Sequence, residues 1–100
     1  MALVPGGWSE VKHATAEIQK YCDQVKKQIQ EKTNHKFEHF KAEKFKSQTV
    51  KGTNYLIKIH VKGTSYIHVK LYHKLPCDGG TVEVSGVQEN HTKDDPLVSF

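Results

Sequence analysis

The sequence Gln48-Thr49-Val50-Lys51-Gly52 separates two runs in which apolar and polar residues alternate. The first run ends near Ser47, and the second begins at Asn54. Successive side chains of a β-strand point to opposite faces, so this alternation predicts two strands. Glycine adopts backbone conformations that other residues avoid, and Gly52 therefore permits a tight connection between the strands. The stretch predicts a β-hairpin with Val50 at its tip.

Alternation continues after this hairpin and predicts an antiparallel meander. A turn at 63–65 joins two strands, and a turn at 75–80 leads to a third strand that begins at Thr81. The apolar residues on one face of the first two are Tyr55, Ile57, Ile59 and Val61, followed by Ile67, Val69 and Leu71. Before the hairpin, Phe45 has the opposite parity to Ala42. Either a β-bulge separates these two residues, or Phe45 points away from the core.

Residues 15–31 show the spacing of an amphipathic helix. Apolar residues recur every three or four positions, at Ile18, Tyr21, Cys22, Val25 and Ile29. Thr15 is a candidate N-cap because its hydroxyl can accept a hydrogen bond from an amide of the first turn, and Ser9 is a rival. Asn34 tolerates the left-handed conformation in which helices often end. We therefore expect one helix of about four to five turns.

A helix followed by a meander with one apolar face predicts an α+β fold, in which a curved antiparallel sheet wraps the N-terminal helix. The chain of 100 residues suffices for one core, and we expect a single domain spanning 1–100. No apolar run approaches the roughly 20 residues that a membrane-spanning helix needs. The first residues lack the basic leader and apolar run of a signal peptide. We therefore expect a cytoplasmic protein with no membrane partner.

Charge and cysteine content narrow the possible partners. The net charge is +4, but the lysines are interleaved with 11 acidic residues, so we expect no nucleic-acid partner. Cys22 lies on the helical stripe and Cys77 in a glycine-rich turn, so we predict two free thiols, that of Cys77 being exposed. We expect a monomer, with a domain-swapped dimer and a Cys77-linked dimer as the alternatives.

The two turns at 48–52 and 75–80 should be neighbours, because alternate connections of a meander lie at the same end of the sheet. The segment before Thr15 joins them if it runs back along the sheet edge. Together these segments would form a wedge with a mostly apolar tip, made of Leu3, Val4, Pro5, Val50, Leu75 and Pro76. A protruding apolar edge suggests a partner with a matching groove.

Gln48, Val50 and Gly52 form the pattern Q-x-V-x-G, which resembles the first hairpin of the cystatins. The flanking Ser47 and Thr53-Asn54-Tyr55 make the chain similar to the stefins, the small intracellular cystatins. Two further motifs, Pro5-Gly6-Gly7 and Leu75-Pro76, occur in the family order and at the family spacing. The resemblance therefore covers nearly the whole chain.

The resemblance implies a cystatin-like fold and reversible, tight-binding inhibition of papain-like cysteine proteases such as lysosomal cathepsins. In that family the wedge enters the active-site cleft, with the first hairpin near the catalytic centre. The N-terminal segment lies on the acyl side, and the second hairpin lies on the leaving-group side. The protease-binding residues that it implies are Leu3, Val4, Pro5, Gly6, Gln48, Thr49, Val50, Lys51, Gly52, Leu75, Pro76 and Cys77. Thr49 and Lys51 differ from the Val and Ala common at these variable positions, which bears on affinity.

The chain itself offers no recognisable catalytic site. Nucleophilic catalysis needs an activated nucleophile beside a base, whereas Cys22 is expected in the core and no pattern places a histidine and an acid around Cys77. We therefore predict no catalytic residue, no metal and no cofactor. Gly6 would instead let an inhibitor chain turn away before its carbonyl reaches the protease nucleophile.

Histidines and lysines on the outer face of the sheet suggest an alternative function. His60 and His68 fall on this face of neighbouring strands and could lie across from each other, with Lys58, Lys62 and Lys70 around them. A metal site would need more ligands and fewer cations, so we favour a solvated basic face. Such a face could bind an anionic partner in a cystatin-fold module that does not inhibit proteases. Trp8 is expected to pack on the base of the helix or, alternatively, to contact the target.

Overall fold

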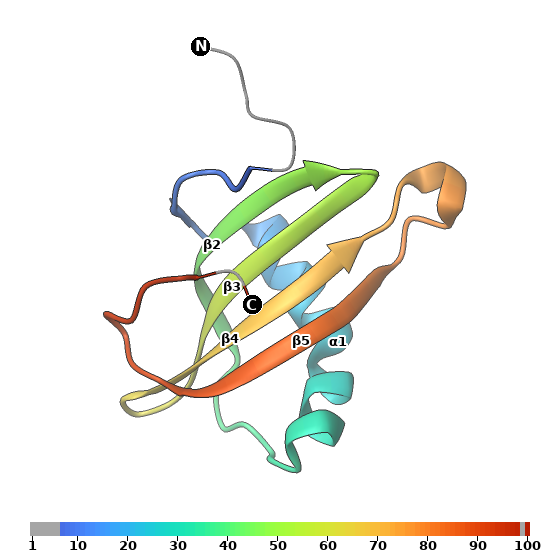
Figure 1. Cartoon of the computed structure of the whole chain (residues 1–100). Coiled ribbons are helices and arrows are strands. Elements are labelled where there is room, and N and C mark those ends of the chain that lie inside the picture. Colours follow the sequence, from blue (N-terminus) through green and yellow to red (C-terminus); the bar gives the residue numbers. More distant parts are fainter. Residues whose placement is uncertain (1–6, 99) are drawn as a thin grey trace.

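In the computed structural model, which describes residues 7–98 and 100, one long helix packs against an antiparallel sheet (Figure 1). The elements of the described residues are β1 (Lys12–His13), α1 (Ala16–Thr33), β2 (Lys41–Val50), β3 (Gly52–Lys62), β4 (Ser65–His73), the 3₁₀ turn η1 (Pro76–Asp78) and β5 (Val82–His91). The strands follow one another across the sheet in sequence order, and each neighbouring pair is antiparallel. This arrangement confirms the predicted α+β class. None of the helices among the described residues is long and apolar enough to cross a membrane.

Local capping determines where α1 begins and ends. The Thr15 hydroxyl oxygen accepts a hydrogen bond from the Ile18 amide at 3.3 Å, as expected of an N-cap. Asn34 ends the helix in the left-handed conformation, with φ of 57°. Ser9, the rival cap, lies outside the helix, and its amide donates to the Ser47 carbonyl at 2.7 Å. The predicted helix is therefore correct and Thr15 is its cap.

The core lies between α1 and the concave face of the sheet. The helix buries a stripe of residues, Ile18, Cys22, Val25 and Ile29, against strand residues that include Ile57, Ile59, Val69 and Leu71. Phe45 belongs to this core because a β-bulge shifts the register between Ala42 and Lys44. The side-chain amide group of Gln19 binds two backbone groups next to the bulge. Its oxygen accepts a hydrogen bond from the Ala42 amide, and its nitrogen donates one to the Phe40 carbonyl, both at 2.8 Å. The bulge is thus the correct alternative.

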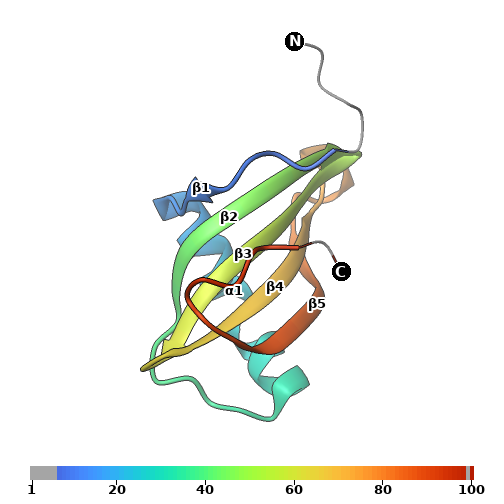
Figure 2. The same ribbon diagram turned by 60° about the vertical axis from the view of Figure 1, so that its left-hand side comes forward.

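The prediction of a solvated basic face on the opposite side of the sheet is wrong for Lys58 and His68, which are buried, whereas Lys62 is exposed. The C-terminal segment, residues 92–98, crosses this face in front of β3 and β4 (Figures 1 and 2), and its Leu97 is buried. Beneath it, Lys58 and His68 are only 4% and 1% exposed. The Lys58 ammonium group donates to the carbonyl oxygens of Lys93, at 2.5 Å, and Asp95. A chain segment from the same molecule therefore occupies the place that an anionic partner would need.

Strand register also separates the two histidines that were expected to face each other. Lys58 lies opposite His68, and His60 lies opposite Tyr66. The His68 ring instead stacks on His91 of β5, with ring centres 3.7 Å apart. Among the described residues, no group of three or more histidine, cysteine, aspartate or glutamate side chains could hold a metal ion.

Candidate functional site

The first hairpin projects beyond the end of the sheet. Its last paired residues are Val50 and Gly52, with Lys51 at the turn, whereas β4 ends at His73 opposite Thr53. Strand pairing with β4 therefore stops before the tip of the hairpin, and Val50 at this tip is 41% exposed. An apolar residue exposed at the tip of a hairpin is suited to insertion into an apolar groove.

Close approach of β4 explains the glycine at position 52. Its φ of 102° lies in a region that side chains disfavour. A Cβ atom there would lie 2.5 Å from the His73 carbonyl oxygen and 3.0 Å from the Tyr72 hydroxyl oxygen. Any larger residue would therefore collide with the end of β4. The sequence predicted that Gly52 permits a tight turn, and the structure shows that packing against β4 also requires glycine at this position.

Gln48 anchors the base of this hairpin to two neighbours. Its side-chain oxygen accepts a hydrogen bond from the Asn54 amide group at 2.9 Å across the hairpin. Its backbone forms an isolated antiparallel bridge with Trp8. Trp8 therefore pairs with the first hairpin, away from the base of the helix where it was first expected, and the alternative of contact with the target stays a prediction.

The described part of the N-terminal segment runs back along the sheet edge and reaches the first hairpin, so the condition for a three-part wedge is met as far as Trp8. Residues 12 and 13 pair with β2, and the chain passes along that strand toward Trp8 (Figure 2). The predicted contact residues Leu3, Val4, Pro5 and Gly6 lie outside the described residues. The described part of the segment therefore begins beside the first hairpin, where Trp8 pairs with Gln48.

The second predicted hairpin contains the short turn η1. Leu75 is half-buried and precedes it, whereas Pro76 and Cys77 are exposed. Backbone hydrogen bonds close the turn, from the Gly80 amide to the Leu75 carbonyl at 3.0 Å and from the Lys74 amide to the Thr81 carbonyl at 2.9 Å. Both hairpins lie at the same end of the sheet, and the 63–64 turn lies at the other (Figures 1 and 2).

Two residues that the sequence did not indicate link these hairpins. The Tyr72 hydroxyl donates to the Lys51 carbonyl at the first hairpin, and a His73 ring nitrogen lies 3.2 Å from the Gly80 carbonyl of the second. The ring of His73 also packs on Tyr21 of α1, with centres 4.8 Å apart. Their position near the end of a predicted strand was visible in the sequence, but their partners depend on strand register.

The two cysteines differ in a way that bears on chemistry. Both thiols are free, that of Cys77 being exposed. Cys22 is fully buried, and burial, with a smaller effect from Asp23, raises the pKa of its thiol to about 12. The nucleophilic thiolate form of Cys22 is therefore negligible near neutral pH.

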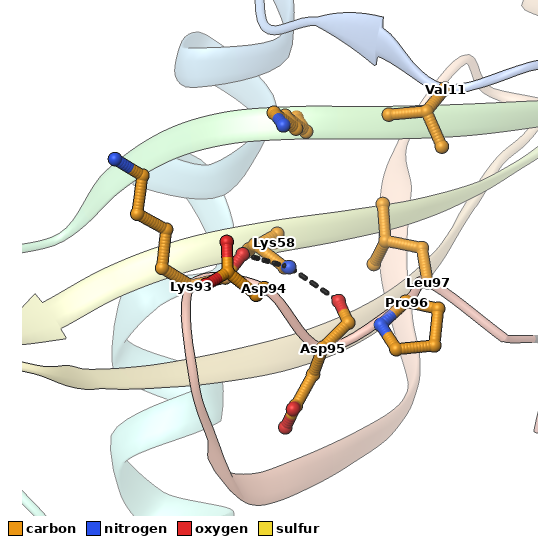
Figure 3. Close-up of a pocket in the computed structure, with 8 residues that line it drawn as sticks. Val11, Lys58, Lys93, Asp94, Asp95, Pro96 and Leu97 are labelled. Atoms are coloured by element: carbon orange, nitrogen blue, oxygen red, sulfur yellow. Dashed lines mark hydrogen bonds between the residues drawn. The ribbon is translucent and has the colours of Figure 1, made fainter.

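A cavity of about 180 Å³ lies beneath the C-terminal segment (Figure 3). Its wall includes Val11, Lys58, Asp95 and Leu97. Figure 3 shows the Lys58 ammonium group directed at the carbonyls of this segment. Burial, followed by the charge of Lys44, lowers the pKa of Lys58. Because its ammonium group donates hydrogen bonds to these carbonyls, Lys58 anchors the C-terminal segment to the sheet.

Comparison with known proteins gives consistent matches over nearly the whole chain. Residues 6–94 match the model of the cystatin domain. Cystatin-A1 of Sus scrofa is 48% identical, over 98% of this chain and 95% of its own length. Cystatin-B of Oplegnathus fasciatus is 44% identical over the full length of both chains. Leukocyte cysteine proteinase inhibitor 1 of Sus scrofa is 43% identical, over 98% of this chain and 95% of its own.

Proposed function

The chain belongs to the cystatin family, and within it to the stefins or type 1 cystatins, and from this premise we propose that it is a reversible, tight-binding inhibitor of papain-like cysteine proteases. The observation that carries the proposal is the exposed Val50 at the tip of a hairpin that projects beyond the sheet. Two further segments with the family motifs lead to the same end of the molecule. A three-part apolar edge of this kind fits a cleft.

As a member of the cystatin family the chain is not an enzyme, in agreement with the relative that is named a cysteine proteinase inhibitor. The cleft would be blocked without a reaction in the inhibitor. Val50 would supply apolar contact near the catalytic centre, and the half-buried Leu75 with Pro76 would contact the leaving-group side. Residues 3–6 would occupy the acyl side, with Gly6 turning the chain away from the nucleophile.

We further propose that the targets are lysosomal cathepsins and that the protein acts as a monomer in the cytoplasm. There it would protect the cell against protease that leaks from lysosomes. The alternative function, binding of an anionic partner through the outer face, receives no support, since the C-terminal segment covers Lys58 and His68. The absence of a nucleic-acid or membrane partner remains a prediction.

Titration of active papain with the purified protein tests the proposed function. We expect inhibition that reaches completion at one inhibitor per protease and that is reversed on dilution. Trypsin and a metalloprotease serve as controls and should keep full activity, because the wedge matches one kind of cleft and offers no reactive group. Failure to inhibit papain, or equal inhibition of trypsin, would refute the proposal. The complex should bury roughly 1,600 Å² or somewhat more.

Removal of residues 1–6 should accelerate dissociation from papain without disturbing the fold. The deleted residues carry little of the apolar pattern of the core and precede Trp8, the first of the described residues that pairs with the sheet, so the thermal midpoint should not change. Interface changes act mainly on the dissociation rate, which we expect to rise while the association rate stays similar. Surface plasmon resonance can measure both. Gly6→Arg tests the same contact by steric hindrance, and unchanged dissociation of both variants would exclude the N-terminal segment from the interface.

Hydrogen peroxide should join two molecules through Cys77 and thereby abolish inhibition. The oxidant takes two electrons and two protons from the two Cys77 thiols, which form one disulfide while peroxide becomes water. The disulfide would place the two wedges against each other. A thiol reductant should restore both monomer and inhibition, and Cys77→Ser should stay monomeric, because Cys22 is buried. A Cys77-linked dimer with full inhibition, or a dimer in Cys77→Ser, would contradict this expectation.

A further inference from the structure

Tyr72 occupies a specific place between the two hairpins. It lies in β4, one residue before the strand ends, and pairs with Asn54 of β3. Its hydroxyl donates to the carbonyl of Lys51, the turn residue of the first hairpin. Its ring lies against Gly52, since a Cβ atom on that glycine would be 3.1 Å from the Tyr72 ring carbon Cε1. One side chain therefore holds the turn by a hydrogen bond and by packing.

The next residue along the chain ties the same strand end to the second hairpin. A His73 ring nitrogen lies 3.2 Å from the Gly80 carbonyl, and the His73 carbonyl faces Gly52. Because Tyr72 and His73 point to opposite faces of β4, the two contacts approach from opposite sides of the sheet. The orientation of each hairpin is thus fixed relative to one strand end.

We propose that Tyr72 is a positioning residue for inhibition, whose hydroxyl holds the Lys51 carbonyl and keeps the first hairpin in the orientation that enters the protease cleft. This inference rests on the proposed function, because it concerns the same wedge. Tyr72 itself need not contact the protease. It acts through Lys51 and Gly52, which carry Val50.

Preorganisation explains why such a residue affects affinity. Without a lateral contact, a projecting hairpin samples several orientations, and only the competent fraction binds, which raises the apparent dissociation constant in proportion. A hydrogen bond of this kind contributes about 0.5 to 1.5 kcal/mol net, which corresponds to about 2- to 10-fold in the equilibrium. The loss of affinity for the protease on removal of this hydrogen bond should therefore be moderate and measurable.

The test compares Tyr72→Phe with Tyr66→Phe. Tyr72→Phe removes the hydroxyl but keeps the ring on Gly52. Tyr66 lies on the same face of the same strand at the opposite end, where it packs on His60 with ring centres 4.9 Å apart. Each variant is measured for its inhibition constant against papain, its thermal midpoint, and hydrogen–deuterium exchange of the amides of residues 50–53 in the free protein.

We expect Tyr72→Phe to raise the inhibition constant about 2- to 10-fold and to accelerate exchange in residues 50–53, with the inhibition constant of Tyr66→Phe unchanged. An unchanged inhibition constant and unchanged exchange in Tyr72→Phe would overturn the proposal. Equal weakening in both variants would also overturn it, because the effect would then follow overall stability. If the unmodified protein does not inhibit papain, the proposed function fails, and exchange alone decides whether Tyr72 fixes the hairpin.

Discussion

Val50→Asp is expected to weaken inhibition of papain by about a hundredfold or more. In the complex, an unpaired carboxylate would be buried in an apolar cleft, which costs several kcal/mol, and every 1.4 kcal/mol is about tenfold in affinity. In the free protein, the side chain at position 50 is 41% exposed, so the charge remains in water. A substitution at such a surface position changes the free energy of unfolding by about 0.5 kcal/mol or less, a shift of only a few degrees.

Val98→Asp provides the matched control. Val98 is 61% exposed and follows the buried Leu97 in the C-terminal segment, which crosses the outer face of the sheet (Figure 1). Val98→Asp introduces the same charge outside the three segments of the wedge. Its inhibition constant should therefore equal that of the unmodified protein. Inhibition constants and thermal midpoints of both variants should be measured together. Normal inhibition by Val50→Asp would show that the hairpin tip does not enter the cleft.

Features that depend on neighbouring residues could be predicted from the sequence. The helix ends follow from the hydroxyl of Thr15 and the left-handed tolerance of Asn34, both of which act within one turn. The first hairpin follows from the alternation around Gly52, and the shared end of the two hairpins follows from meander connectivity. The bulge after Ala42 remained one of two alternatives, because parity alone cannot locate the extra residue.

Features that depend on distant segments could not be predicted in the same way. Alternation placed Lys58 and His68 on the face away from the helix, which is correct, but gave no sign that residues 92–98 cover that face. This segment has no periodic pattern, and only its tertiary position shows that Leu97 is buried. The contact of Tyr72 with Lys51 was likewise invisible, since it joins residues 21 positions apart through strand register.

Acidification from pH 6.5 to pH 4 should lower the free energy of unfolding through His68. Within the described residues, neither ring nitrogen of His68 has a hydrogen-bond partner. The ionisable side chains that face the ring there are Lys58 on β3, the stacked His91 on β5 and Asp95 of the C-terminal segment. Burial, then the charges of His91 and Lys58, lowers the pKa of His68 to about 4, against an opposing effect of Asp95. The folded protein therefore keeps this histidine neutral.

The direction of the effect follows from proton binding. An unfolded chain binds a proton at His68 near pH 6.5, whereas the folded protein binds it only near pH 4. Between these values the unfolded state holds more protons, so stability falls as the pH falls. The loss through His68 should be on the order of 2 to 3 kcal/mol across this window. Asp95 contributes at lower pH. Hydrogen bonds from the Thr92 amide and hydroxyl lower its pKa to about 2, so the stability that its ionised form provides is lost between about pH 4 and pH 2.

Urea unfolding of the unmodified protein, His68→Phe and His13→Phe at pH 7, 5 and 4 separates this contribution from that of other groups. His68→Phe keeps an aromatic ring against His91 but cannot bind a proton, so its stability should fall less between pH 7 and pH 4 than that of the unmodified protein. His13 is exposed on β1, and its replacement should leave the pH dependence similar to that of the unmodified protein. An equally steep fall for His68→Phe would contradict the prediction. The C-terminal segment should be affected first, because the charge that His68 gains lies beside the Lys58 ammonium group that anchors it.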